Sequence, residues 1–238
     1  MIDTHCHILW GIDDGAKDRW ECIEMLKSAA KDGIQVIAAT SHIKEPIFNN
    51  DKDRLHKAKV ELEKAIKKHQ IGIQIVTGAE NFVSFSTMHK LKEHQFVPYE
   101  NSNYLLVEFS WTINMRDHPT RFLRAIIKEG YRPVIAHPER YQWVHQDYSL
   151  LKTWQKMGCL LQVNRTSILG LDKREKANQI VKTMLEDGLV DVIASDAHHP
   201  YEPRVAKLSD VYQSIASTYG KSKADLYFYH NPAKIIGR

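Results

Sequence analysis

Short apolar runs rich in β-branched residues alternate along the chain with longer stretches in which apolar residues recur every three or four positions. The short runs predict strands and the longer stretches predict amphipathic helices. The predicted strands cover residues 1–4, 35–40, 71–77, 104–109, 133–136, 160–163 and 190–194. The predicted helices cover residues 20–31, 53–69, 87–94, 119–129, 149–156, 173–187 and 203–219. This alternation, without repeat or linker, predicts one α/β domain over residues 1–238 with a parallel sheet, either a barrel or a doubly wound sheet.

Composition and charge exclude several classes of protein. The chain has 238 residues, of which 43% are apolar and 26% charged, as is typical of globular proteins. The formal net charge of +4 is mild, and lysines between 57 and 68 alternate with Glu61 and Glu63, so we expect no nucleic-acid partner. The positive net charge slightly favours an anionic substrate over a cationic one. No apolar run approaches the roughly 20 residues of a membrane span, so we expect no membrane insertion. Three cysteines without a Cys-x-x-Cys pair, and no signal segment, predict a cytoplasmic protein.

Residues that can bind metals follow nearly every predicted strand. His5 and His7 follow the first strand, and Asp196 and His198 follow the last. Alternate residues of an extended segment point the same way, so each pair can face one ion. The intervening strands are followed by further histidine and glutamate residues, namely His42, Glu80, Glu108, His137 and Glu139. Because a parallel barrel gathers the carboxyl ends of its strands at one rim, we expect these residues to converge there. A doubly wound sheet gathers them less completely.

The mixture of ligands indicates the chemistry. Imidazoles and carboxylates without thiolates suit zinc, manganese or iron, and they are too many for one tetrahedral ion, which predicts two or three divalent metals. Clustered ions are typical of phosphatases and nucleases. Arg140 and Arg204 follow the fifth and seventh strands and are placed to bind phosphate oxygens, with Arg165 a third candidate. Asp14 lies in an Asp-Asp-Gly sequence that is also common turn chemistry, so it is either a ligand or a turn residue.

Four segments, 3–9, 11–16, 136–140 and 194–198, resemble the signatures of the polymerase-and-histidinol-phosphatase (PHP) superfamily. Asp13-Asp14-Gly15-Ala16 makes the chain more closely similar to its bacterial capsule-associated protein-tyrosine phosphatases, the CpsB/YwqE type. The resemblance implies a distorted TIM-like (β/α)7 barrel with a trinuclear centre that commonly uses manganese (Mn2+), with iron or zinc as alternatives. It also implies a phosphotyrosine-bearing protein as substrate, the tail of a bacterial tyrosine autokinase that regulates capsular exopolysaccharide synthesis.

The same resemblance implies roles for individual residues. One ion would be held by His5, His7, Glu80 and Asp196, and a second by Glu80, Glu108 and His137. Asp14, His42 and His198 would lie near a third ion, while Arg140 and Arg204 would bind the phosphate. The segment Thr40-Ser41-His42-Ile43 departs from the Thr-Pro-His-His that is usual in this branch, which affects the shape of the third site.

We therefore expect in-line attack of a metal-bridging hydroxide on phosphorus. Glu139 and His198 are candidates for protonating the leaving tyrosine oxygen. Aromatic residues near the expected rim are candidates for contacting the tyrosine ring, namely Trp10, Phe48, Phe82, Trp111 and Tyr141.

Other functions share parts of this pattern. Cys159 and Arg165 match the Cys-x5-Arg signature of cysteine-dependent tyrosine phosphatases, but the apolar residues between them predict a strand that holds the two side chains roughly 20 Å apart. A small-molecule phosphomonoesterase such as histidinol-phosphate phosphatase shares every proposed ligand. A binuclear amidohydrolase commonly has a lysine on its fourth strand, where this chain has Glu108. A non-catalytic partner-binding barrel is the remaining alternative.

Overall fold

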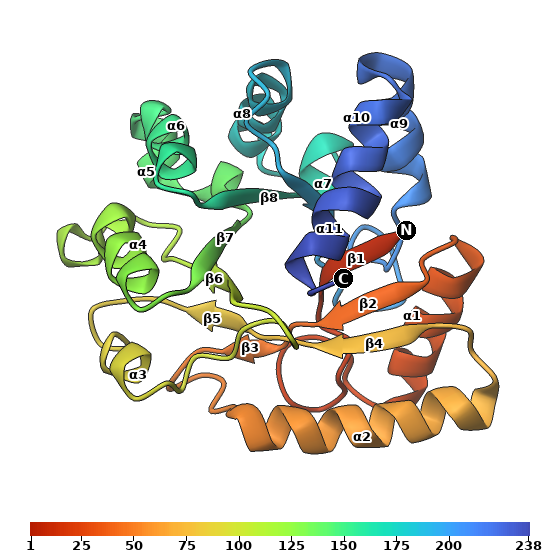
Figure 1. The fold of residues 1–238 in the computed structure, drawn as a ribbon. Helices are drawn as coiled ribbons and strands as arrows, with labels where there is room; N and C mark the ends of the chain where they lie inside the picture. Colours follow the sequence, from red (N-terminus) through yellow and green to blue (C-terminus); the bar gives the residue numbers. More distant parts are fainter.

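All strand pairs in the computed structural model, which describes residues 1–238, are parallel. The strands are β1 (Ile2–Cys6), β2 (Val36–Ala39), β3 (His42–Ile43), β4 (Gln74–Thr77), β5 (Glu80–Phe82), β6 (Tyr104–Glu108), β7 (Arg132–Ala136), β8 (Leu160–Asn164) and β9 (Val192–Ala194). They form a three-stranded sheet in the order β1-β2-β4 and a six-stranded sheet in the order β3-β5-β6-β7-β8-β9 (Figure 1). Because β3 continues β2 and β5 continues β4 after short breaks, the nine strands occupy seven positions.

The last strand position returns to the first. Cys6 at the end of β1 forms an isolated parallel bridge with Ala197, just beyond β9. The His7 amide donates to the Ala197 carbonyl, and the Asp196 amide donates to the His5 carbonyl, each at 2.9 Å. The strands therefore form a distorted (β/α)7 barrel. This confirms the predicted fold class and excludes a doubly wound sheet.

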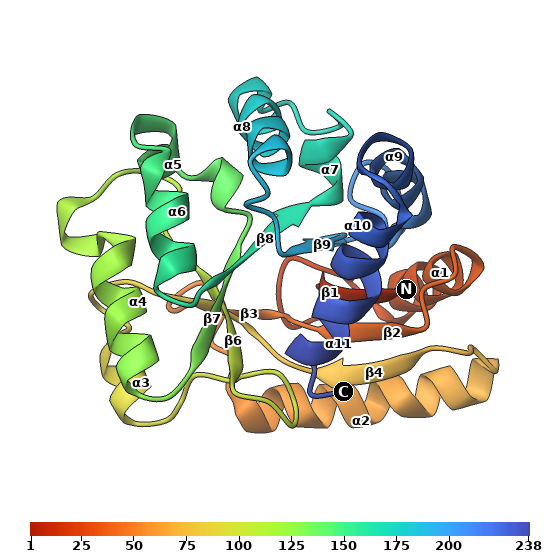
Figure 2. The same ribbon diagram turned by 45° about the horizontal axis from the view of Figure 1, so that its top comes forward.

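The helices surround the strands. They are α1 (Arg19–Lys31), α2 (Lys52–His69), α3 (His89–Lys92), α4 (Pro119–Lys128), α5 (Gln142–Gln146), α6 (Ser149–Lys156), α7 (Arg165–Ile168), α8 (Glu175–Glu186), α9 (Ser209–Tyr219), α10 (Lys221–Asp225) and α11 (Asn231–Ile235). Short 3-10 segments η1 (Met115–Asp117) and η2 (Pro138–Arg140) and a π-helical segment η3 (Leu226–His230) complete the chain. Helix α2 packs against β4, α4 against β7 and α6 against β8 (Figures 1 and 2). None of the helices combines the length and apolar character that crossing a bilayer requires.

Most predicted elements are confirmed, with differences at breaks and ends. The predicted helix 87–94 contains only the four-residue α3, and the predicted helix 203–219 begins at Ser209. Strands β3 and β5, which continue the second and third strands after breaks at Thr40 and Ser41 and at Gly78 and Ala79, were not predicted. The C-terminal stretch after Gly220 forms three short helical segments that the hydrophobic pattern did not predict.

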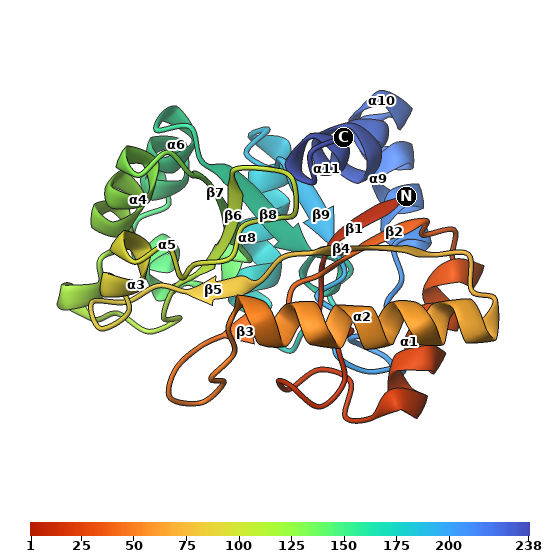
Figure 3. The same ribbon diagram turned by 60° about the horizontal axis from the view of Figure 1, so that its bottom comes forward.

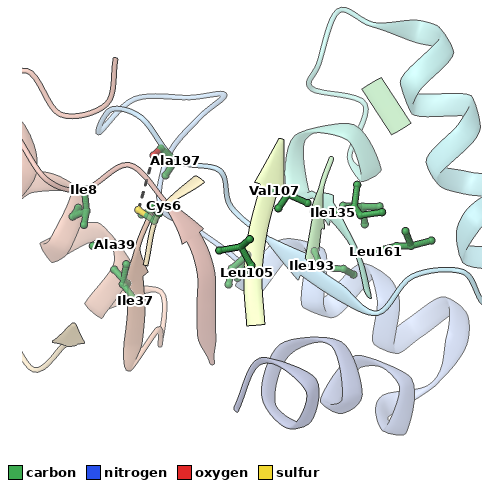
Figure 4. Packing of buried hydrophobic residues seen from close by; sticks show 14 of the residues in the cluster. Cys6, Ile8, Ile37, Ala39, Leu105, Val107, Ile135, Leu161, Ile193 and Ala197 are labelled. Carbon is green, nitrogen blue, oxygen red and sulfur yellow. Dashed lines mark hydrogen bonds between the residues drawn. The ribbon is translucent and has the colours of Figure 1, made fainter. Parts of the chain in front are cut away.

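The core lies on both faces of the barrel strands. Ile37, Leu105 and Ile135 belong to a large cluster between strands and helices, part of which is seen in Figure 4. Their neighbours along the strands belong to a second cluster, which includes Val36, Ala38, Leu106, Val134 and Ala136. Since alternate residues of a barrel strand face inside and outside, the second cluster fills the barrel interior.

The first and last segments of the chain lie together. Ile235 and Ile236, at the end of α11, belong to the interior cluster. Helix α11 also packs against β1, and the two termini lie near each other in Figures 1 and 3. The C-terminal helices therefore cover the end of the barrel from which β1 begins.

Candidate metal centre

The nine residues predicted as metal ligands converge at the carboxyl ends of the strands. Each lies in at least one of four overlapping groups whose potential ligand atoms are within 4.8 Å of one another. The groups are His5, His7 and Asp196; His5, Glu80 and His137; His42, Glu80 and Glu108; and His7, Asp14, His42 and His198. All nine are buried except Asp14, whose side chain is 49% exposed. The convergence expected from the strand ends is therefore present.

Glu80, at the start of β5, lies at the centre of the cluster. Its Oε2 is 3.3 Å from Nε2 of both His5 and His7, and 3.1 Å from Nδ1 of His42. Its Oε1 is 2.9 Å from Nε2 of His137. A carboxylate with two oxygens directed at four imidazoles has the geometry of a bridging ligand.

Asp196 is the second carboxylate shared by several groups. Arg140 and Asn164 donate to its Oδ2 at 3.0 and 2.7 Å, and Arg204 donates to its Oδ1 at 2.9 Å. The same Oδ1 is 3.6 Å from Nε2 of His5. Asp196 therefore links the two predicted phosphate-binding arginines to the histidine cluster.

The ring orientations of His5 and His7 are fixed by residues that were not predicted as ligands. Nδ1 of His5 donates to Oε1 of Gln162 at 2.8 Å, and Nδ1 of His7 donates to Oδ2 of Asp13 at 2.8 Å. When Nδ1 carries the proton, Nε2 presents a lone pair, so both Nε2 atoms face the cluster as potential ligands. Asp13 also accepts from the backbone amide of Gly15, so Asp13 makes the turn while Asp14 lies 3.5 Å from His42 and His198.

Burial and opposite charges set the protonation states of the site. Burial acts to raise the pKa values of Glu80 and Asp196, but neighbouring histidines and, for Asp196, Arg204 outweigh it and hold both pKa values well below their usual range. Burial lowers the pKa of His198 to about 4, which keeps its imidazole neutral near pH 7. Burial also lowers the pKa of His137.

Burial acts to lower the pKa values of His5 and His7, but Glu80 and Asp196 beside His5, and Asp13 and Glu80 beside His7, outweigh it and raise both. Burial raises the pKa of Glu108. Metal binding requires the deprotonated ligands, so a cation bound there would replace the protons that these groups favour in its absence.

Two strand-end residues have unusual backbone conformations. His137 has a φ of 36° and Asp196 a φ of 51°, in the left-handed region that non-glycine residues rarely occupy. Such conformations cost of order 1–3 kcal/mol each and persist only where the surroundings fix them. Here the hydrogen bonds and ion pairs of the cluster fix both residues.

Gly15 packs directly against His7. A Cβ atom at this position would lie 2.1 Å from the His7 carbonyl oxygen and 2.5 Å from its Cβ. The Asp13-Asp14-Gly15-Ala16 segment therefore needs its glycine for close approach to a candidate ligand.

The surroundings of the remaining polar candidates bear on the roles proposed for them. Arg165 is buried and pairs with Glu202 and Asp210 at 3.0 and 2.7 Å, neither of which is a metal-ligand candidate, so the structure gives the phosphate-binding hypothesis for it no support. Glu139 is fully buried, and its Oε1 accepts from the backbone amide of Asn164, so it cannot reach a leaving group. Cys159 immediately precedes strand β8, and burial raises its thiol pKa to about 12.

The candidates for contacting the tyrosine ring also differ in their surroundings. Tyr141 is buried and its hydroxyl donates to the Ala136 carbonyl, while the ring of Phe48 stacks on His42. Phe82 and Trp111, by contrast, line a hollow of about 330 Å³ that reaches Glu108. Lys44 lies in the same hollow, donates to Glu108 Oε2 at 2.9 Å and sits 4.6 Å from the centre of the Phe82 ring. No strand-end pattern singled out Lys44, because it follows the two-residue strand β3.

Comparison with known proteins agrees with the geometry. The tyrosine-protein phosphatase CpsB of Streptococcus agalactiae serotype V is 30% identical over 240 residues, covering 99% of this chain and 98% of that protein. The tyrosine-protein phosphatase YwqE of Bacillus subtilis is 33% identical over 204 residues, covering 84% and 78%.

Structural comparison gives the same relationship. A crystal structure from work on YwqE of Bacillus subtilis and CpsB of Streptococcus pneumoniae, described as unique metal-dependent tyrosine phosphatases, matches with a TM-score of 0.90 at 28% identity. The match covers 99% of this chain and 94% of that one. The model of the family described as capsular polysaccharide synthesis, CpsB/CapC, matches residues 1–237. The chain therefore belongs to the CpsB/CapC family of capsular polysaccharide synthesis proteins.

Proposed function

We propose that this chain is a metal-dependent protein-tyrosine phosphatase that hydrolyses phosphotyrosine on protein, with residues 1–238 as one catalytic domain. The observation that carries the proposal is the buried cluster centred on Glu80, in which carboxylates and imidazoles from six strand positions face one another. The named activity of the relatives CpsB and YwqE supports it.

The cluster fits bound cations on its own chemistry. The Nε2 atoms of His5 and His7 lie 3.1 Å apart, and each ring has an acceptor opposite its Nδ1. Two nitrogen lone pairs at that distance repel, so either a proton on one ring or a metal ion lies between them, beside the Glu80 carboxylate. A divalent ion satisfies these ligands together, since it accepts lone pairs from all of them at once.

We assign the ligands as the resemblance implied. His5, His7, Glu80 and Asp196 would hold one ion, with Glu80 bridging to a second. Glu108 and His137 would complete the second site, and Asp14, His42 and His198 would hold a third ion. Divalent ions bound there would polarise the phosphoryl oxygens and activate water. We propose two or three ions, because the ligands are too many for one, and Mn2+ as the preferred metal, as the resemblance implies. Iron and zinc are alternatives, because imidazoles and carboxylates without thiolates suit all three metals.

The remaining residues would bind and orient the substrate. The Arg140 and Arg204 guanidinium groups, already directed at Asp196, would donate to phosphoryl oxygens and stabilise the charge that develops on them. Phe82 and Trp111 would contact the phenol ring in the hollow beside Glu108. The aromatic walls favour phosphotyrosine over phosphoserine, because only the former presents a ring.

The natural substrate we propose is the phosphorylated tail of a bacterial tyrosine kinase that controls capsule or exopolysaccharide synthesis. Membership of a capsular polysaccharide synthesis family supports this partner. We place the reaction in the cytoplasm, and the three free cysteines, all buried, are consistent with a reducing compartment.

Hydrolysis of a phosphotyrosyl peptide tests the proposal. Activity should require Mn2+, disappear with a chelator, return when Mn2+ is restored, and resist thiol alkylation, since the thiol of Cys159 is buried. Loss on alkylation without loss on chelation would contradict the metal mechanism. Faster turnover of histidinol phosphate than of the peptide would instead identify a small-molecule phosphomonoesterase.

A further inference from the structure

A second hollow, of about 500 Å³, lies next to the metal cluster on the other side of Trp111. Trp111 lines both this hollow and the one beside Glu108. Its ring has the Arg174 guanidinium 4.7 Å and the Arg140 guanidinium 5.6 Å from its centre. One aromatic side chain therefore separates the proposed ring site from a neighbouring cationic surface.

The lining of the second hollow is strongly cationic. It includes Arg140, Lys173, Arg174 and Arg204, against a single carboxylate, Asp172. Even when Asp196, which accepts from Arg140 and Arg204, is counted with Asp172, four positive charges face two negative ones. An excess of two positive charges favours an anionic occupant.

The two sites share a residue that connects them. Nη1 of Arg140 donates to Asp196 in the metal cluster at 3.0 Å, and Nη2 donates to Asp172 in the hollow at 3.1 Å. A phosphoryl group held at the cluster and an anion held in the hollow would therefore lie on opposite sides of one guanidinium. Residues two apart in an extended peptide point the same way, so the phosphotyrosine and a side chain two residues from it could enter the two sites together.

Two polar groups in the hollow have no protein partner. Lys173 is exposed and forms no ion pair, unlike Arg174, which is bound to Asp172 at 2.7 Å. The Thr166 hydroxyl is buried and makes no hydrogen bond. A buried polar group without a partner is costly, so an occupant that offers acceptor oxygens would satisfy it.

We infer that this hollow is a subsite for an anionic side chain that flanks the phosphotyrosine in the substrate, either a carboxylate or a second phosphoryl group. The inference rests on the proposed function and extends it to substrate selection. Lys173 and Arg174 supply the positive charge, and Trp111 separates the flanking residue from the tyrosine ring.

Matched peptides test the subsite. One phosphotyrosyl peptide has Glu two residues before and two residues after the phosphotyrosine, the second has Gln at the same positions, and the third has a second phosphotyrosine in place of one Gln. We expect kcat/KM about three- to tenfold higher for an anionic flank than for the Gln peptide, as one or two exposed ion pairs provide. The measured quantity is the ratio of kcat/KM between two peptides. A change in the chemical step affects both peptides equally and therefore does not alter this ratio.

Lys173→Glu should reduce that ratio to about one or invert it, without removing any ion pair of the folded protein. Lys182→Glu makes the same charge change on the exposed face of α8, outside the hollow, and should leave the ratio unchanged. Preference for the Glu peptide alone identifies a carboxylate, and preference for the doubly phosphorylated peptide alone identifies a phosphoryl group. Equal turnover of all three peptides, or a ratio unaffected by Lys173→Glu, overturns the subsite while leaving the phosphatase intact. No turnover of any peptide by metal-loaded protein would overturn the proposed function itself.

Discussion

Gly15→Ala is a one-carbon change that tests whether the Asp-Asp-Gly-Ala segment positions a ligand of the metal centre. The new Cβ would lie 2.1 Å from the His7 carbonyl oxygen and 2.9 Å from its carbonyl carbon. Both obstacles are backbone atoms, so no side-chain rotation relieves the overlap. An ordinary carbon–oxygen contact is about 3.3 Å, so the segment and His7 must separate by roughly 1.2 Å.

That displacement sets the expected magnitude. Overpacking of a buried site costs about 1–3 kcal/mol of unfolding free energy. Misplacing a reacting or catalytic group by about 1 Å can lower the rate on the order of 100-fold. We therefore expect kcat/KM for a phosphotyrosyl peptide to fall by about 100-fold, with weaker Mn2+ binding, because His7 no longer faces Glu80.

Gly72→Ala is the matched control. A Cβ at Gly72 meets no atom within 4 Å, and its φ lies outside the left-handed region, so turnover and thermal stability should not decrease. Peptide hydrolysis across a Mn2+ titration and thermal unfolding, measured on both variants, provide the comparison. A Gly15→Ala protein with unchanged turnover and metal affinity would refute the reasoning, since His7 would then tolerate the shift.

Three further changes test separate parts of the structure. Gln162→Leu removes the acceptor opposite Nδ1 of His5 and should weaken Mn2+ binding by about 10- to 100-fold in calorimetric titration, whereas unchanged affinity would show that the ring needs no support. Cys159→Ser should retain peptide turnover, because the thiol lies before a strand and its pKa is raised to about 12 by burial; loss of turnover would restore the cysteine mechanism. Glu100→Gln should lower the midpoint of thermal unfolding at pH 7. Burial opposes ionisation of Glu100, but hydrogen bonds, first among them that from Lys59, outweigh it and lower its pKa from 4.5 to about 2. Because the folded pKa is depressed, this stabilisation, under about 1 kcal/mol at a partly exposed site, is present above pH 4.5 and should vanish as the pH falls toward 2; a difference independent of pH would contradict it.

The ligand residues could be predicted because a parallel barrel imposes a simple rule on them. Strands end at one rim, so His5, His42, Glu80 and His137 could be expected to meet without knowledge of any distance. The residues that orient these ligands were harder to predict from the sequence. Gln162 and Asn164 occupy alternate positions of an otherwise apolar strand, which is the pattern of polar groups facing the barrel interior, but the pattern does not say which ligand each contacts.

Other features depended on contacts between distant segments. Strands β3 and β5 could not be predicted, because they are only two and three residues long and form their ladders with segments distant in the sequence. Arg165 resembled Arg140 and Arg204 as an arginine after a strand, yet only its three-dimensional neighbours, Glu202 and Asp210, distinguish it. Strand-end position therefore identifies candidates, and tertiary partners assign them.

The most direct test of the metal centre is to count Mn2+ ions bound per chain in parallel with peptide turnover, for the unchanged protein and for Glu80→Gln. Glu80 contacts four histidines, so losing its charge should disrupt more than one site. We predict two or three ions per chain and metal-dependent turnover in the unchanged protein, with fewer ions and no measurable turnover in Glu80→Gln. Full turnover by Glu80→Gln in the presence of a chelator would contradict a metal centre at the strand ends.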